Sequence, residues 1–317
     1  MNQTDNDRKQ ARLVEIDDET AGQRLDNYLF RTLKGLPKSR VYRIIRKGEV
    51  RVNGRRIKPD WRLQAGDQVR IPPIVHLPDR EQAVGHFHDL PGMILYESDR
   101  LLIINKPSGM AVHGGSGQQV GVIESLRHAL PDGDRLELVH RLDRGTSGCL
   151  MVARRRSYLR LLQDALRKPG QIRKRYLALV HGEWPDSLTE VDQPLLTVSP
   201  TGQERVTRVD ATGKPATTRF RVIARESGLT LLQASPMTGR THQIRVHARW
   251  ARHPLAGDDR YGDRLLDTEM GFSQLMLHAR GLDIPALGGQ PAVSVEAPLN
   301  DAFAETLRKH FKEDLNI

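Results

Sequence analysis

A short polar segment between two apolar runs constrains this chain more than any other feature of its sequence. The runs span residues 136–139 and 149–153 and have the length and composition of buried strands. The connection between them contains two glycines and two hydroxyl residues, which is turn chemistry. It carries one carboxylate, Asp143, flanked by Arg141 and Arg144. Asp143 is therefore expected to be ionised at neutral pH and able to act as a nucleophile or a base. The alternative is that Asp143 caps the turn and pairs with an arginine for structural reasons.

The composition indicates a soluble globular protein of one large domain or two. The chain has 317 residues, 38% of them hydrophobic and 28% charged. No apolar run approaches the roughly 20 residues of a membrane span, and the first ten residues lack the apolar core of a signal peptide. The single cysteine, Cys149, excludes an intrachain disulfide and is expected to be a small core residue. These features predict a cytoplasmic protein without a membrane partner.

The net charge of +10 comes from one segment of the chain. Residues 22–73 contain 14 Lys and Arg against 4 Asp and Glu, so the rest of the chain is close to neutral. An excess confined to one segment indicates a module that binds a polyanion, although a solvated basic helix face would give the same count.

The pattern within this basic segment predicts two helices followed by a hairpin. Apolar residues are spaced for helices at 23–33 and 40–47, with Ser39 as the N-cap of the second, and Asn53-Gly54 indicates a tight turn after a strand. This arrangement suits binding to RNA phosphates. The candidate RNA-binding residues are Arg24, Lys38, Arg40, Arg43, Arg46, Lys47, Arg51, Arg55 and Arg56.

Four regions follow from these patterns. Residues 1–20 are expected to form a disordered tail, in which 13–16 could be a short strand, and residues 21–75 the basic module. Residues 76–92 are rich in proline, histidine and charge and are expected to be a linker. Residues 93–317 alternate between strand and helix patterns and are expected to form the larger domain.

Other segments of the larger domain give weaker signals. Residues 112–117 are rich in glycine but lack the ending of a nucleotide-binding loop. His242 and His247 are five residues apart, which is a poor spacing for a metal pair on a helix. The acidic residues at 258–263 could bind a metal, but we favour a structural turn. No nicotinamide, flavin or zinc signature is present in the sequence.

The sequence HRLDRGTSG at residues 140–148 resembles the catalytic motif of RNA pseudouridine synthases of the RluA type. Residues 174–180 and 238–248 resemble two further motifs of that family, and segments between residues 24 and 67 resemble an S4 RNA-binding domain. The resemblance extends from about residue 20 to the end of the chain. Within the family it is greatest to enzymes that modify large-subunit ribosomal RNA.

The resemblance implies an α+β fold: a catalytic domain with a mixed, mainly antiparallel sheet, and a small α/β S4-like RNA-binding domain. It implies an isomerase that flips specific uridines out of RNA, most of all large-subunit rRNA, and converts them to pseudouridine. Asp143 would start cleavage of the glycosidic bond, and Tyr176 would pack against the target base. Arg245 would pair with Asp143, where a bidentate contact would hold the carboxylate ionised and oriented. Arg141 would fill the gap left by the flipped nucleotide.

Bond cleavage and re-formation conserve oxidation state, so neither a cofactor nor a metal is expected. RNA is the expected partner, and the chain is expected to be a monomer. Whether Asp143 attacks the base, attacks the sugar or removes a sugar proton is left open by the residues.

Three other functions fit parts of the sequence. One is a non-catalytic rRNA-binding or ribosome-assembly factor, and another is a pseudouridine synthase that acts on tRNA. The third is a glycosidase or nuclease, but a glycosidase usually needs two carboxylates and a nuclease commonly needs a metal. Only Asp143 lies in a catalytic motif.

Overall fold

A computed structural model describes residues 11–33, 36, 38–73, 91–114, 121–198, 206–312 and 315. The chain divides into two compact units, Met1–His86 and Phe87–Ile317. The predicted linker at 76–92 falls, apart from its last two residues, outside the described residues. None of the described helices is long and apolar enough to cross a membrane.

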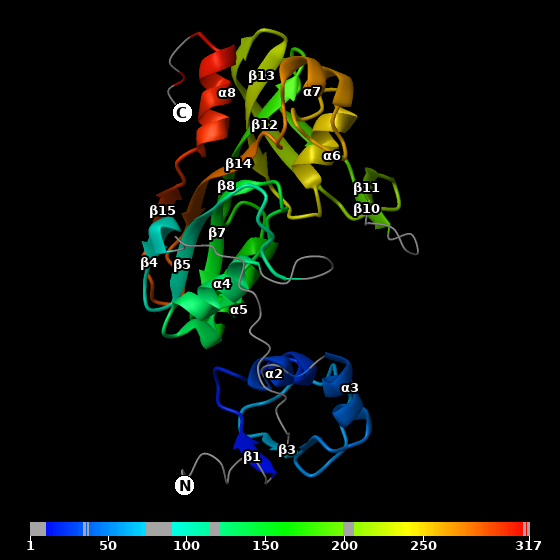
Figure 1. The fold of residues 1–317 in the computed structure, drawn as a ribbon, viewed down its shortest axis with the longest axis vertical. Coiled ribbons are helices and arrows are strands. Elements are labelled where there is room, and N and C mark those ends of the chain that lie inside the picture. Colours follow the sequence, from blue (N-terminus) through cyan, green and yellow to red (C-terminus); the bar gives the residue numbers. More distant parts are fainter. Residues whose placement is uncertain are drawn as a thin grey trace. The chain divides into compact units, whose positions relative to one another are not determined.

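The small unit packs two helices against a three-stranded antiparallel sheet of order β1-β3-β2 (Figure 1). Its core is formed by the apolar faces predicted from the spacing, including Leu25 and Leu29 of the first helix and Val41, Ile44 and Ile45 of the second. The elements are β1 (Arg12–Glu15), α2 (Leu25–Thr32), α3 (Lys38–Arg46), β2 (Arg51–Val52) and β3 (Gln68–Ile71).

Strand β1 corrects one prediction. Residues 12–20 do not belong to a disordered tail, because β1 pairs with β3 and Ile16 is buried in the core of the unit. The short strand considered at 13–16 is confirmed, one residue earlier, as Arg12–Glu15. Ser39 lies inside α3 rather than at its N-cap, since the helix begins at Lys38. The Asn53-Gly54 turn is confirmed. Both residues have positive φ angles, 50° and 74°, as a type I′ turn requires.

The larger unit is built on a ten-stranded sheet, which confirms the predicted mixed, mainly antiparallel architecture. The main path is β4-β5-β7-β14-β8-β13-β12-β9, with β6 paired to β7 and β15 to β14. Within the described residues the only parallel pair of this sheet is β7 with β14. The strands are β4 (Ile94–Glu97), β5 (Leu101–Lys106), β6 (Glu137–Leu138), β7 (Ser147–Ala153), β8 (Arg173–His181), β9 (Glu190–Asp192), β12 (Thr217–Glu226), β13 (Leu229–Pro236), β14 (Leu277–Ile284) and β15 (Val293–Glu296).

Helices cover both faces of this sheet (Figure 1). On β8, Tyr176 and Ala178 belong to a core cluster that includes residues of α5 and α6, whereas Leu177 and Leu179 pack with Phe303 of α8. This alternation follows from the period of two along a strand. The remaining elements are α4 (Val122–Ala129), α5 (Arg156–Arg167), α6 (Gln243–Trp250), α7 (Arg264–Met270), α8 (Asp301–His310), the short 3-10 helices η1 (Pro91–Met93) and η2 (Gly133–Arg135), and a separate hairpin of β10 (Leu195–Val198) with β11 (Val206–Val209).

Candidate active site

Asp143 lies on the loop that joins β6 to β7, two strands that pair with each other. The loop is folded tightly, since the N–H of Thr146 donates to the carbonyl of Asp143 at 3.1 Å. Leu142 and Thr146, on either side, are buried. The Asp143 side chain keeps 26% of its surface exposed. The loop therefore presents one partly open carboxylate from a rigid base, as the sequence pattern predicts.

The turn that follows β5, at residues 106–110, hydrogen-bonds to this loop and supports it. The ammonium of Lys106, at the end of β5, donates to the carbonyl of Arg144 at 3.1 Å and to those of Pro107 and Met110 at 2.8 and 2.7 Å. The hydroxyl of Ser108 donates to the carbonyl of Gly145 at 2.8 Å. No sequence pattern had marked Lys106 or Ser108 as a support of the Asp143 loop.

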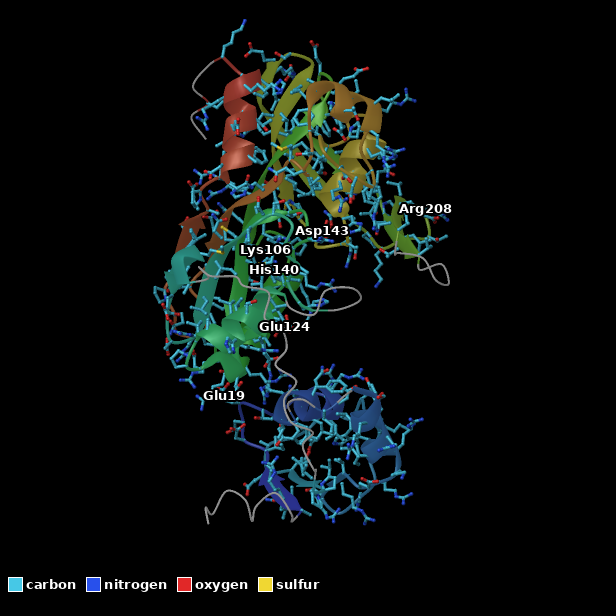
Figure 2. All side chains as sticks on the ribbon, viewed as in Figure 1. Glu19, Lys106, Glu124, His140, Asp143 and Arg208 are labelled. Carbon is cyan, nitrogen blue, oxygen red and sulfur yellow. The ribbon has the colours of Figure 1, made fainter. Side chains whose placement is uncertain are left out.

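Lys106 is also an electrostatic neighbour of Asp143. Its side chain is fully buried, and burial lowers its pKa to about 7, an effect that the charge of Asp143 opposes. Lys106, His140 and Asp143 lie in the same region of the larger unit (Figure 2). A lysine at the end of an apolar strand, directly before a proline, is the signal that could have pointed to this contact.

His140 anchors the start of the loop. Its Nε2 accepts a hydrogen bond from the backbone N–H of Met151 at 3.2 Å. Burial, and then the charge of Lys174, lower the pKa of His140 to about 4. The ring is therefore neutral at physiological pH, which is the form that can accept this bond.

Arg245 reaches Asp143 from the helix α6. Its Nη1 lies 3.4 Å from Oδ2 of Asp143, across 102 residues of sequence. The helix is fixed by the buried amide of Gln243, whose Nε2 donates to Thr217 and Thr218 and whose Oε1 accepts from Thr238 and Arg240. The structure thus brings together the two residues that the motifs pair, and α6 determines where the guanidinium lies.

The geometry differs from the expected bidentate contact with Asp143. Arg245 uses its fork on Asp258 instead, with Nε and Nη2 at 2.8 and 2.6 Å from the two carboxylate oxygens. Asp258 is buried and also accepts from the backbone N–H groups of Arg260 and Tyr261. The acidic segment at 258–263 is therefore a structural turn, as favoured, but its first residue positions Arg245.

The pKa values of this pair follow from their mutual contact. Burial would lower the pKa of Arg245, but the hydrogen bonds and charge of Asp258 outweigh it and raise that pKa. Burial would raise the pKa of Asp258, but Arg245 outweighs it and lowers that pKa. The ring of Tyr261 lies 5.1 Å from the guanidinium carbon of Arg245 and supports it by a cation–π contact.

His242 is a further neighbour of Asp143 that the sequence analysis did not single out for this place. Its Nε2 lies 3.8 Å from Oδ1 of Asp143, while its Nδ1 lies 2.7 Å from the hydroxyl oxygen of Tyr261. Its backbone is left-handed, with φ of 54°. Burial lowers its pKa, although Asp143 opposes the shift. His247, by contrast, bonds Thr218 and the carbonyl of Gln193. The two histidines therefore have separate partners.

Tyr176 lies on the same face of the sheet as the loop and α6. It is buried and shares a core cluster with Leu142 and Ile244, the direct neighbours of Asp143 and Arg245. Burial, and then the negative charge of Asp143, raise the pKa of Tyr176. Its ring is therefore a neutral phenol within electrostatic reach of the carboxylate. Arg141, two residues before Asp143, is exposed.

The predicted RNA-binding residues of the small unit differ in exposure and in the partners of their side chains. Arg43, Arg46 and Lys47 are exposed on α3 and its end, Arg55 and Arg56 are exposed after the turn, and Arg40 is half-buried. Arg24 is already bound to the buried Asp26 at 2.7 Å, and Arg51 donates weakly to the carbonyls of Gly48 and Gly54. The side chain of Lys38 lies outside the described residues.

Metal-ligating side chains do not gather in the part of the chain that the structure describes. No group of three or more His, Cys, Asp or Glu there could hold a metal ion. Cys149 is buried, as expected, and burial raises the pKa of its thiol to about 11.

Comparison with known families gives the class of each part. Residues 100–250 match the family described as RNA pseudouridylate synthase, and residues 23–69 match the S4 domain. The first match contains Asp143, Tyr176 and Arg245. The chain is thus a catalytic domain of the pseudouridylate synthase type preceded by an S4 domain.

Relatives match nearly the whole chain. It is 50% identical over 308 residues to the ribosomal large subunit pseudouridine synthase C of Escherichia coli O157:H7, covering 94% of this chain and 96% of the relative. Identity to the protein of the same name from Vibrio vulnificus (strain CMCP6) is 47%, with coverage of 95% and 97%. The chain therefore belongs to the RNA pseudouridine synthase family, which confirms the resemblance seen in its motifs.

Solved structures agree with this assignment. Human RNA pseudouridylate synthase domain containing 4 matches with a TM-score of 0.56 and 26% identity, covering 69% of this chain and 93% of the other. Human RNA pseudouridylate synthase domain containing 1 matches with a TM-score of 0.54 and 25% identity, covering 67% of this chain and 86% of the other.

Proposed function

We propose that this protein converts specific uridines of large-subunit ribosomal RNA to pseudouridine and that Asp143 starts the reaction. The observation that carries the proposal is the partly open carboxylate of Asp143, held 3.4 Å from Arg245 within the segment that matches the synthase family. The choice of substrate is supported by the names of relatives that are 47–50% identical over almost the whole chain.

In the proposed reaction the C1′–N1 bond of a flipped uridine breaks, the uracil rotates, and a C1′–C5 bond forms. The proton leaves C5 and N1 gains one, so no electron is transferred and no cofactor is required. Asp143 initiates the cleavage, and Arg245 orients it. Tyr176 packs against the uracil, since a base taken out of its helix needs an aromatic or apolar partner. The exposed Arg141 occupies the gap that the base leaves.

The small unit holds the RNA in this proposal. The exposed Arg43, Arg46 and Lys47 follow one another along α3 and its end, where phosphates can reach them. Contacts of this kind position an RNA without reading its sequence, so the choice of uridine belongs to the larger unit and the shape of the RNA.

We further place the protein in the cytoplasm, where its single buried thiol stays reduced. One copy of the chain is sufficient, because Asp143, Tyr176 and Arg245 all come from it. A synthase that acts on tRNA would use the same site, and a ribosome-assembly factor would use only the small unit. The substrate assay below separates these three functions.

The deciding experiment compares Asp143→Asn with the wild type on transcripts of large-subunit rRNA and of tRNA. Pseudouridine formation on rRNA should fall on the order of a thousandfold or more, because the variant keeps the shape of the side chain and loses the negative charge that attack or proton removal requires. Affinity for RNA should stay within about twofold. Asp164→Asn, an exposed carboxylate on α5, serves as the matched control and should retain full activity.

Normal activity of Asp143→Asn would refute the role of Asp143. Wild-type protein that binds rRNA but forms no pseudouridine in any transcript would favour the assembly factor. Pseudouridine in the tRNA transcript alone would favour a synthase that acts on tRNA.

A further inference from the structure

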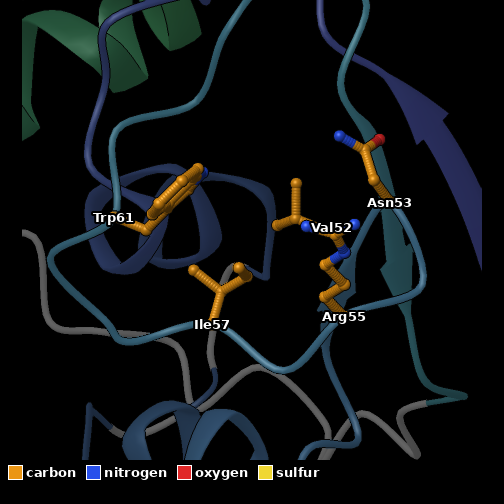
Figure 3. A pocket seen from close by; sticks show the side chains of 5 residues that line it. All are labelled: Val52, Asn53, Arg55, Ile57 and Trp61. Carbon is orange, nitrogen blue, oxygen red and sulfur yellow. The ribbon is translucent and has the colours of Figure 1, made fainter.

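The small unit contains a cavity of about 320 Å³ that the catalytic scheme does not use. It is lined by Val52, Asn53, Arg55, Ile57 and Trp61. Figure 3 shows the indole of Trp61 on one side, Val52, Asn53 and Arg55 on the other, and Ile57 between them. This volume is at the lower end of the roughly 300–1,000 Å³ of small-molecule sites, which suits a ligand of about one ring system.

Trp61 provides a flat apolar wall that is held in place. Its backbone N–H donates to the carbonyl of Lys58 at 3.1 Å, and its carbonyl accepts from the N–H of Leu25 at the start of α2 at 2.8 Å. The residue nevertheless stays 43% exposed. A half-exposed tryptophan on a fixed backbone, next to the buried Val52 and the half-buried Ile57, can accept a second flat group without rearrangement of the backbone.

Arg55 places a positive charge at the same cavity. Its backbone is fixed by the type I′ turn, because its N–H and carbonyl both bond Val52, at 2.9 and 3.1 Å. Its side chain is exposed and has no carboxylate partner among the residues that the structure describes. The segment 51–62 around it carries five Lys and Arg and only one acidic residue, Asp60.

Asn53 also lines the cavity, but the hydrogen-bonding groups of its amide are occupied by other residues. Its amide nitrogen donates to Asp67 at 2.7 Å, and its amide oxygen accepts from the N–H of Gln68 at 2.8 Å. The cavity therefore offers a stacking face and a cation but few free hydrogen-bonding groups that could read a base edge. Such a site takes any base and no particular one.

We propose that this cavity is a subsite for one unpaired base of the RNA substrate, which stacks on Trp61 while Arg55 contacts the adjacent phosphate. This inference rests on the RNA binding stated under the proposed function and adds a preference for single-stranded RNA next to the modified region. A base inside a duplex has both faces covered by its neighbours and cannot enter. An acidic peptide would satisfy Arg55 but would leave the indole without a matching flat group.

The test measures the affinity of the full-length protein for two fluorescein-labelled probes, a mixed-sequence single strand of about eight nucleotides and a duplex of the same length. Trp61→Leu keeps apolar bulk and removes the aromatic face, and it should weaken single-strand binding about 5- to 100-fold while duplex binding stays within about twofold. Trp61→Phe should restore most of the loss. Leu13→Ala, an exposed apolar residue of the same unit that does not line the cavity, should change neither affinity.

Salt dependence separates the two contacts. Arg55→Gln should reduce the slope of log affinity against log salt by about 0.7 for the single strand, whereas Trp61→Leu should leave that slope unchanged. Equal losses on both probes, or no loss with Trp61→Leu, would overturn the subsite, as would Trp61-dependent binding of hexaglutamate. These readouts need no pseudouridine formation, so a protein that proves inactive on rRNA would refute the proposed function without deciding the subsite.

Discussion

Replacing Lys106 by methionine should change how the stability of the larger unit depends on pH. The lysine side chain is fully buried, and its ammonium bonds three backbone carbonyls around the Asp143 loop. Methionine has a similar length and shape but carries no charge and donates no hydrogen bond. The variant therefore removes one titrating group from the interior and leaves three carbonyls without that donor.

The magnitude follows from the two pKa values of Lys106. The pKa is 10.5 for a free lysine and about 7 in the fold, where burial disfavours the cation. Between these values the unfolded chain binds a proton that the folded chain has released, so wild-type stability rises with pH. The slope is about 1.4 kcal/mol per pH unit while the difference in bound protons is complete. Below pH 7 both states are protonated, and the contribution no longer changes.

The assay is urea unfolding at about pH 7, 8 and 9, because these values lie inside the window. Both proteins carry Trp61→Phe, so that fluorescence reports only on the larger unit, which contains the buried Trp184. The stability of wild type minus that of Lys106→Met should increase by about 1 kcal/mol for each pH unit. Lys168→Met, an exposed lysine of the same unit, should show a constant difference from wild type.

A difference between wild type and Lys106→Met that stays constant from pH 7 to pH 9 would refute the reasoning. It would mean that the three carbonyls and the charge of Asp143 keep Lys106 protonated throughout. The pH dependence thus distinguishes burial from hydrogen bonding as the dominant influence on this ammonium.

Two further predictions concern the support of the site. Asp258→Asn should destabilise the larger unit by about 3–5 kcal/mol in urea unfolding, because Arg245 stays buried and loses its one fully buried charged partner, whereas Asp259→Asn should cost less than about 0.5 kcal/mol. Asp259 also contacts Arg245 but is 90% exposed, so equal losses in the two variants would contradict the assignment. Gly148→Ala should lower stability more than Gly109→Ala in thermal unfolding. Both glycines have positive φ, which costs an alanine about 1–2 kcal/mol. At Gly148 a Cβ would also clash with the backbone of Ala279 in β14, adding about 1–3 kcal/mol, and at Gly109 it would meet open space. Similar losses of stability in Gly148→Ala and Gly109→Ala would show that β14 can shift to make room for the added Cβ.

Local patterns predicted the elements well wherever the residues of an element determine its structure. The helices α2 and α3 and the loop after β6 lie close to their predicted positions, because periodicity and turn chemistry act over a few residues. The strand β1 was considered at 13–16, but only as a possible strand within a segment assigned to a disordered tail. Its four residues alternate weakly, and what orders them is pairing with β3, more than 50 residues away.

The candidate site was harder to predict from the residues. Asp143 and Arg245 are 102 residues apart, and no spacing rule connects them, so their pairing came from the family motifs. Lys106 stands out as a lysine at the end of an apolar strand, but its acceptors are backbone carbonyls, which no residue type identifies, so its contacts could not be predicted. Asp258 was correctly assigned to a turn, but its role as the main partner of Arg245 depends on where α6 packs.

The distribution of contacts around Arg245 bears on how Asp143 could act in the proposed reaction. A guanidinium that closed its fork on Asp143 would occupy both carboxylate oxygens and stabilise the negative charge that has to react. Here the fork is closed on Asp258, which neutralises much of the charge of Arg245 and fixes its position. The contact of Asp143 with Arg245 is long, at 3.4 Å, and about a quarter of the Asp143 side chain is exposed. Asp143 is therefore oriented by Arg245, whose own position is fixed by Asp258. Asp258 thus contributes to the site by holding the fork of Arg245, which leaves the carboxylate of Asp143 available to the substrate.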